Sequence, residues 1–174
     1  PVWVFEFLLL FTQTVHAAFM NYVLGGSWFL LWLHFGREIQ WKDRLYHRCL
    51  SVAPVALSMT ITFGVAPLLF VQVLYGQFFY TANVLMGGFW LSVLVILVGC
   101  FYGLYILKAK NREGSSEWLE NGFARIALHL LLALGFSGIA FLLTANAVLT
   151  ISPGVWEEAY VGSPIQTVVT QVPF

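Results

Sequence analysis

Four long apolar stretches constrain the fold of this chain more than any other feature. They cover residues 4–35, 50–75, 84–107 and 123–151, and none has a Lys, Arg or Asp in its central part. A helix needs roughly 20 mostly apolar residues to cross a membrane, and each stretch is long enough. The stretches are continuously apolar rather than alternating, and a backbone in lipid must satisfy its own hydrogen bonds, which a helix does within one segment. The sequence therefore predicts an all-α integral membrane protein, a bundle of four transmembrane helices.

The composition excludes several other classes of protein. Only 9% of the residues are charged, compared with about 25% in soluble domains. The net charge is zero, so no basic excess exists to bind a nucleic acid. Two cysteines, Cys49 and Cys100, are too few for a disulfide scaffold or a cysteine metal cluster. No acidic residue lies deep in an apolar stretch, which argues against a proton pump built on buried carboxylates.

The basic residues predict the orientation of the bundle. They lie in the two connections after the first and third stretches, or just inside the fourth, whereas residues 76–83 carry no charge. By the positive-inside rule the two basic connections face the cytoplasm. Both termini then lie outside a bacterial-type inner (cytoplasmic) membrane, and we divide the chain into a four-helix module, 1–151, and an extracytoplasmic tail, 152–174. The basic residues are Arg37, Lys42, Arg44, Arg48, Lys108, Lys110, Arg112 and Arg125.

Prolines and small residues give finer expectations. Pro54 is expected in the first turn of the second helix, where a missing N–H does little harm, and Pro67 is expected to kink that helix. Gly99 and Gly103 form a GxxxG spacing, and Gly135 leaves a small surface on the fourth helix, so that helices can approach closely there. Each of these glycines is equally explained as an ordinary small residue of a membrane helix.

Four histidines are the candidates for chemistry. His16 lies near the middle of the first helix, His34 at its cytoplasmic end, and His129 in the cytoplasmic half of the fourth helix. An ionisable residue inside a membrane is a functional hypothesis by default, and a neutral imidazole in a helical bundle commonly binds haem iron. The two alanines after His16 leave room for a macrocycle. The alternative is a hydrogen bond to a neighbouring helix, and His47, among basic residues, is expected to face lipid headgroups.

Depth in the membrane limits which residues can share a haem. His16 lies at mid-membrane or slightly outward, whereas His129 lies ~9 Å from the cytoplasmic end, at ~1.5 Å per residue. Met86 is a candidate sixth ligand of an iron bound to His16, since Met/His ligation is known, and core packing is its alternative. His34 and His129 are candidates for a second haem. We therefore expect one or two b-type haems.

Three short stretches carry a resemblance to a known family. They are TVHAAF (14–19) with Gly25, FGVAP (63–67) with Gln72 and Gly76, and ALGFS (133–137) with LTAN (143–146) and SPG (152–154). With these stretches the chain resembles the N-terminal four-helix part of subunit I of cytochrome bd-type quinol oxidases, in which a histidine at the position of His16 is a haem ligand. The resemblance implies a bd-like membrane haem protein with its N-terminus outside.

Departures from that family narrow the expected function. The family's third helix carries glutamates, whereas residues 84–107 contain no acid, and the family's quinol-binding loop lies in a half that this sequence lacks. We therefore expect not a complete oxygen-reducing enzyme but a non-catalytic or partial subunit. It would pass electrons between the quinone pool, with quinone at an interface, and a partner such as a c-type cytochrome, among other membrane subunits and lipid. The alternative is a cofactor-free anchor or structural subunit of a respiratory or photosynthetic complex.

Overall fold

The computed structural model describes residues 2–35, 39–113, 122–152 and 154, and this part of the chain is helical without strands. Each of its helices is long and apolar enough to cross a membrane. This confirms the prediction of an all-α protein with four candidate transmembrane helices, while the sides of the termini stay a prediction. The helices are α1 (Val2–His34), α2 (Gln40–Leu85), α3 (Gly87–Glu113) and α5 (Gly122–Ile151).

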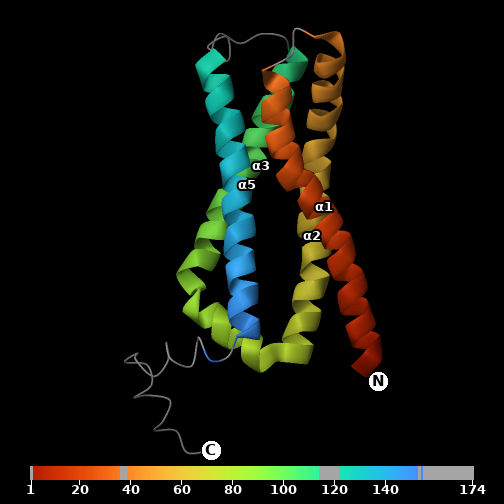
Figure 1. Cartoon of the computed structure of the whole chain (residues 1–174), viewed down its shortest axis with the longest axis vertical. Helices are drawn as coiled ribbons and strands as arrows, with labels where there is room; N and C mark the ends of the chain where they lie inside the picture. The colour runs from red at the N-terminus through yellow and green to blue at the C-terminus, as the bar shows by residue number, and fades with distance from the viewer. Residues whose placement is uncertain (1, 36–38, 114–121, 153, 155–174) are drawn as a thin grey trace, which may run out of the picture.

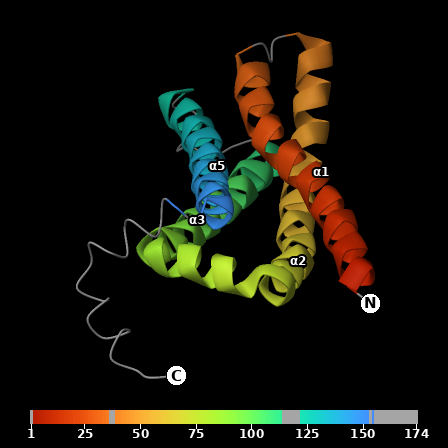
Figure 2. The same cartoon turned by 60° about the horizontal axis from the view of Figure 1, so that its bottom comes forward.

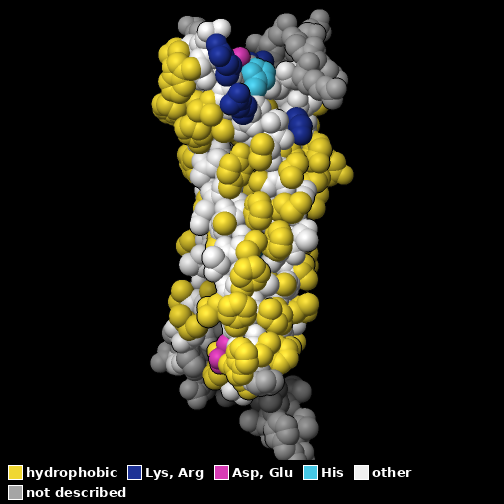
Figure 3. Space-filling view, turned by 90° about the vertical axis from the view of Figure 1, so that its right-hand side faces the viewer, with side chains coloured by type: hydrophobic (Ala, Val, Ile, Leu, Met, Phe, Trp, Pro, Cys, Tyr) yellow, Lys and Arg dark blue, Asp and Glu magenta, His cyan; other side chains and the backbone are white. Residues whose placement is uncertain are grey.

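The four helices run up and down, and α1 crosses α2 at an angle (Figures 1 and 2). The end where α1 and α3 finish and where α2 and α5 begin is called the basic end here. Lys and Arg side chains gather there, above a body covered by apolar side chains (Figure 3). Lys42 illustrates the boundary, because its ammonium lies 4.3 Å from the ring centroid of Trp32 and 5.7 Å from that of Trp41. Such cation–π contacts suit a lysine between apolar and aqueous surroundings.

The first and last helices agree closely with the sequence prediction, with ends within two residues of 4–35 and 123–151. The third begins three residues later than expected and continues six residues further. Residues 108–113, which follow the predicted third stretch, are therefore helical. The tail 152–174 lies outside the described residues, apart from Ser152 and Gly154.

The second helix differs most from its prediction. It covers 46 residues and bends at Tyr75, whose φ of −130° and ψ of 30° are not helical. The ten residues after the bend turn across the end of the bundle (Figure 2) and bury Phe79 and Ala82. Tyr80 donates a hydrogen bond from its hydroxyl to Gln72 Oε1 across the bend, at 3.3 Å. The uncharged connection 76–83 between the second and third stretches is thus helical rather than irregular, and Phe79 and Ala82 are buried against the bundle.

The two prolines of α2 also differ from expectation. Pro54 lies well inside the helix rather than in its first turn, and the bend occurs at Tyr75 rather than at Pro67. Proline leaves carbonyls of the preceding turn poorly bonded. Near Pro54, the ammonium of Lys108 on α3 donates to the carbonyl oxygen of Ser51 at 3.0 Å, which supplies a donor in that turn.

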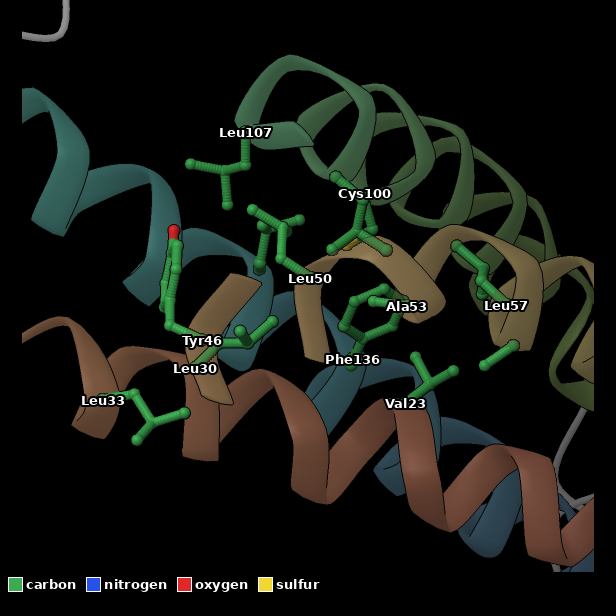
Figure 4. Close-up of a cluster of buried hydrophobic side chains, with 13 residues drawn as sticks. Val23, Leu30, Leu33, Tyr46, Leu50, Ala53, Leu57, Cys100, Leu107 and Phe136 are labelled. Carbon is green, nitrogen blue, oxygen red and sulfur yellow. The ribbon is translucent and has the colours of Figure 1, made fainter. Parts of the chain in front are cut away.

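Small residues join α3 to α5 as expected at two of the predicted positions. A Cβ added at Gly103 would lie 2.9 Å from Leu132 Cδ2, and one at Gly135 would lie 2.6 Å from Cys100 Sγ. Gly99 has open space around the same position, so the GxxxG spacing is used at one of its ends only. Leu132 and Cys100 belong to a buried cluster to which all four helices contribute (Figure 4).

Candidate functional site

His16 lies between α1 and α2 and is half-buried. Its Nδ1 lies 2.9 Å from the carbonyl oxygen of Thr60. A carbonyl only accepts hydrogen bonds, so Nδ1 carries the proton and donates it. The ring rests on the backbone of α2 at Gly64, where an added Cβ would lie 2.8 Å from Cε1 and 3.0 Å from Nδ1. Glycine at position 64 therefore makes room for the imidazole.

This hydrogen bond decides which nitrogen of His16 can act as a ligand. With the proton on Nδ1, the neutral ring has its lone pair on Nε2. Metal-binding histidines usually donate their other N–H to a carbonyl or carboxylate, which fixes the tautomer and the ring orientation. Within the described ranges, no hydrogen bond occupies Nε2 of His16. The ring protonated on Nδ1 thus fits an iron ligand at Nε2. It fits equally well the alternative, in which His16 only joins α1 to α2 by a hydrogen bond.

Flat aromatic side chains flank His16 on the side towards the basic end. Phe19, one helical turn after His16, stacks on Phe63 of α2 with ring centroids 5.7 Å apart and planes 3° from parallel. Phe63 precedes the glycine on which the imidazole rests and is itself exposed. The α1–α2 face therefore offers an imidazole and a pair of stacked rings side by side on the lipid-facing surface. An enclosing wall on the other side would have to come from another molecule.

His129 lies in a different environment, at the basic end. It is 1% exposed, its Nδ1 lies 2.7 Å from the carbonyl oxygen of Arg125, and its Nε2 lies 2.9 Å from the hydroxyl of Tyr46. By the same reasoning, Nδ1 donates and Nε2 accepts from Tyr46. The ring of His34 stacks on that of His129, with centroids 4.9 Å apart and planes 26° from parallel. The structure thus brings His34 and His129 together, as the sequence suggested.

The geometry of this pair does not fit a shared haem. Two axial imidazoles point their nitrogens at one iron from opposite faces of the macrocycle, so that the macrocycle lies between the rings. His34 and His129 instead face each other in a stack, and both nitrogens of His129 are engaged in hydrogen bonds. The arrangement is that of a buried polar network joining α1, α2 and α5.

Met86 lies far from His16. It is 8% exposed and caps the C-terminus of α2, beyond the bend at Tyr75. Thr60, which binds His16, precedes Tyr75 by about 22 Å of helix at ~1.5 Å per residue. The bent segment then runs across the bundle end rather than back towards Thr60 (Figure 1). Met86 therefore packs in the core of that end, and the structure does not place it as a sixth ligand beside His16.

The remaining histidine lies where the sequence suggested. His47 is at the basic end, with Nε2 3.3 Å from Asp43 Oδ2 and Nδ1 beside the amide of Asn111. Asp43, His47 and Asn111 are thus joined in a polar contact between the start of α2 and the end of α3. Across the described ranges, no group of three or more His, Cys, Asp or Glu side chains is placed to hold a metal ion.

The bundle also contains a cavity of about 390 Å³, in the half nearer the basic end, which was not predicted from the sequence. Residues of α1 from Asn21 to Leu30 form one side, and Ala53 of α2, Leu104 of α3 and Phe136 of α5 complete it. The adjacent glycines Gly25 and Gly26 were a signal for it, because two successive glycines in an apolar helix remove side-chain volume.

Comparison with other proteins adds no family to these observations. No protein family, curated protein or solved structure matches this chain.

Proposed function

We propose that this chain is a membrane-embedded b-type cytochrome subunit that transfers electrons between the quinone pool and a redox partner within a larger complex. The observation that carries the proposal is the setting of His16. Its Nδ1 is held by the Thr60 carbonyl and its ring by Gly64, while Nε2 remains available for iron. The resemblance to cytochrome bd-type subunits adds support, since it puts a haem ligand at the same residue.

The chain's own residues would perform three tasks in this role. His16 would hold the haem iron through Nε2, and the Thr60 carbonyl would raise the basicity of that nitrogen through the hydrogen bond at Nδ1. Phe19 and Phe63 would offer an apolar wall of low dielectric, which influences the reduction potential. The haem, when bound, supplies the one-electron chemistry.

The proposal requires a second membrane subunit. The site at His16 lies on the outer face of the α1–α2 pair, and Met86 is too distant to complete it. The sixth ligand and the opposite wall would therefore come from a partner, in agreement with the prediction that the chain works inside a complex. An extracytoplasmic c-type cytochrome as redox partner, and an orientation with both termini outside, belong to the same proposal.

A cofactor-free structural subunit is the second candidate, and the same hydrogen bond favours it. An imidazole that donates to Thr60 already joins α1 to α2, at about 0.6 kcal/mol for such bonds in membranes. His16→Gln separates the two functions, because an amide can still donate to the Thr60 carbonyl but is not a haem ligand.

The test is a reduced-minus-oxidised optical spectrum of the complex purified in mild detergent. We expect a b-type spectrum for the wild type and for His47→Gln, which changes a histidine at the polar surface. In His16→Gln the spectrum should lose one haem or shift its bands and midpoint potential. In His16→Gly, added imidazole should restore the wild-type bands. A complex without haem, or an unaltered spectrum in His16→Gln, would refute the proposal in favour of the structural subunit.

A further inference from the structure

We infer that the cavity between α1, α2, α3 and α5 is a binding site for the headgroup of a lipid-soluble quinone. This inference rests on the proposed function in one respect: an electron-transfer subunit of this kind needs a place for its quinone. The cavity combines a suitable volume, two glycines and one amide in its lining.

The first observation is empty space beside two glycines. A Cβ added at Gly25 or Gly26 would meet nothing within 4 Å. Glycine inside a helix lowers stability by about 0.5–1 kcal/mol relative to alanine, and close packing of another helix usually explains it. At Gly103 and Gly135 that explanation holds, because neighbouring side chains fill the space. At Gly25 and Gly26 no part of the described chain does so, and, unlike the other glycines with open space around them, both line the cavity.

The second observation is a polar side chain at this space. Asn21 lines the cavity and precedes Gly25 by one helical turn, so both lie on the same face of α1. Asn21 is exposed, and its amide makes no hydrogen bond within the residues that the structure describes. The residue lies close to the midpoint of a 33-residue membrane-spanning helix, where a polar group without a partner is unfavourable. The amide therefore suits a ligand that carries a hydrogen-bonding oxygen.

The remaining lining defines the body of that ligand. Phe29 and Phe136 contribute aromatic rings, and Leu30, Ala53 and Leu104 contribute aliphatic surface. Tyr22 is a second polar residue of the lining, and its hydroxyl donates a long hydrogen bond of 3.5 Å to the carbonyl oxygen of Cys49. A flat ring with carbonyl oxygens and an apolar tail matches this combination of groups.

The size of the cavity favours a small molecule such as a quinone over a neighbouring helix as its occupant. Small-molecule sites have volumes of about 300–1,000 Å³, and this cavity has about 390 Å³. A transmembrane helix is about 10–12 Å wide with its side chains, and it could cover the opening but not enter between the four helices. A lipid acyl chain could enter, but it offers Asn21 no oxygen. A quinone headgroup satisfies both the space and the amide.

The position of the cavity agrees with this occupant. It lies between His16 and the network of His34, Tyr46 and His129, because its α1 residues 21–30 fall between positions 16 and 34. The core side chains Phe136 and Ala53 converge on this region from α5 and α2 (Figure 4). A quinone bound here would lie in a pocket that opens at the surface of α1, where Asn21 and Gly25 are exposed, between the depth of His16 and that of the histidine network.

Photolabelling of the complex in membranes with azido-benzoquinone and azido-naphthoquinone probes tests the inference. We expect saturable labelling of the α1 peptide that contains residues 21–30, and competition by the corresponding unlabelled quinone. Gly26→Leu should fill the cavity and Asn21→Leu should remove the hydrogen bond, each weakening labelling by about tenfold or more, which is the loss from one good interaction. The matched control is Gly138→Leu, since Gly138 also has open space but lies outside the cavity, and its labelling should be unchanged.

The outcomes separate this inference from the proposed function. Labelling that persists in His16→Gln, in which haem is lost, supports a quinone site independently of the haem. A b-type spectrum without saturable labelling would overturn the quinone site and leave the haem proposal intact. Equal labelling in Gly26→Leu and Gly138→Leu, or displacement by phospholipid as effective as that by quinone, would also overturn it. Loss of subunit assembly in Gly26→Leu with unchanged labelling would overturn it too, because the glycines would then be a packing surface for a helix of a partner subunit.

Discussion

The close approach of His16 to Gly64 allows a quantitative test by the substitution Gly64→Ala. The new Cβ would lie 2.8 Å from Cε1 of His16 and 3.0 Å from Nδ1, so the ring must move away from the Thr60 carbonyl. Overpacking of this kind destabilises by about 1–3 kcal/mol, and the lost interhelical hydrogen bond adds about 0.6 kcal/mol. Alanine regains up to about 1 kcal/mol as the better helix former. We therefore expect Gly64→Ala to lower the free energy of unfolding by about 0.5–2.5 kcal/mol.

The effect of Gly64→Ala on the free energy of unfolding should change sign when His16 is absent. In a His16→Ala background nothing opposes the new methyl group, and only the helix propensity of alanine remains. Gly64→Ala should then stabilise the protein by up to about 1 kcal/mol. The coupling between the two positions, measured in a double-mutant cycle, should be about 1.5–3.5 kcal/mol, within or slightly above the range for residues in contact.

The assay is reversible unfolding in mixed micelles with increasing SDS, followed by the loss of helical circular dichroism. Gly99→Ala is the matched control, because its Cβ would meet nothing within 4 Å, and it should be neutral or stabilising in both backgrounds. An effect of Gly64→Ala that is the same with and without His16 would refute the packing of His16 on Gly64.

Two further predictions concern the basic end and the orientation. Tyr46→Phe should destabilise by about 1–3 kcal/mol, because it deprives the buried Nε2 of His129 of a hydrogen bond, whereas the exposed Tyr105→Phe should change stability by less than about 0.5 kcal/mol in the same SDS titration. In a cysteine-free background, Lys110→Cys should react with an impermeant maleimide only from the cytoplasmic side and Gln77→Cys only from outside. The reverse pattern of labelling would invert the proposed orientation.

The helices were predictable where one physical cause dominates. The continuous apolar runs of α1 and α5 end close to where polar residues begin, and their limits were correct within two residues. The end of α2 was not predictable from hydrophobicity, because residues 76–85 are too short and too polar to span. They form a helix by lying across the bundle end, which depends on the tertiary surface that Phe79 and Ala82 cover.

The candidate site was predictable in its residue types but not in its partners. An intramembrane histidine stands out in any sequence, and the proximity of His34 and His129 followed from their shared depth. Depth alone could not tell that their rings stack, because that depends on side-chain directions around each helix axis. The pairing of Met86 with His16 failed for a related reason: the bend at Tyr75 carries Met86 away along the bundle end. The cavity was missed because the adjacent glycines Gly25 and Gly26 indicate lost side-chain volume, but the sequence does not tell whether a neighbouring helix fills that volume.

The length of the α1–α2 pair makes the bundle sensitive to the thickness of its bilayer. At ~1.5 Å per residue, α1 is about 50 Å long and α2 is about 54 Å long before its bend, compared with about 40–45 Å for a bilayer with its headgroups. A thin bilayer would accommodate these helices only if they tilt, whereas a thick one lets them stand more upright. Tilt changes the angle at which α1 and α2 cross, and the contact of His16 with Gly64 lies at the interface of those two helices. Acyl-chain length in the surrounding lipid is thus expected to change how closely His16 packs on Gly64.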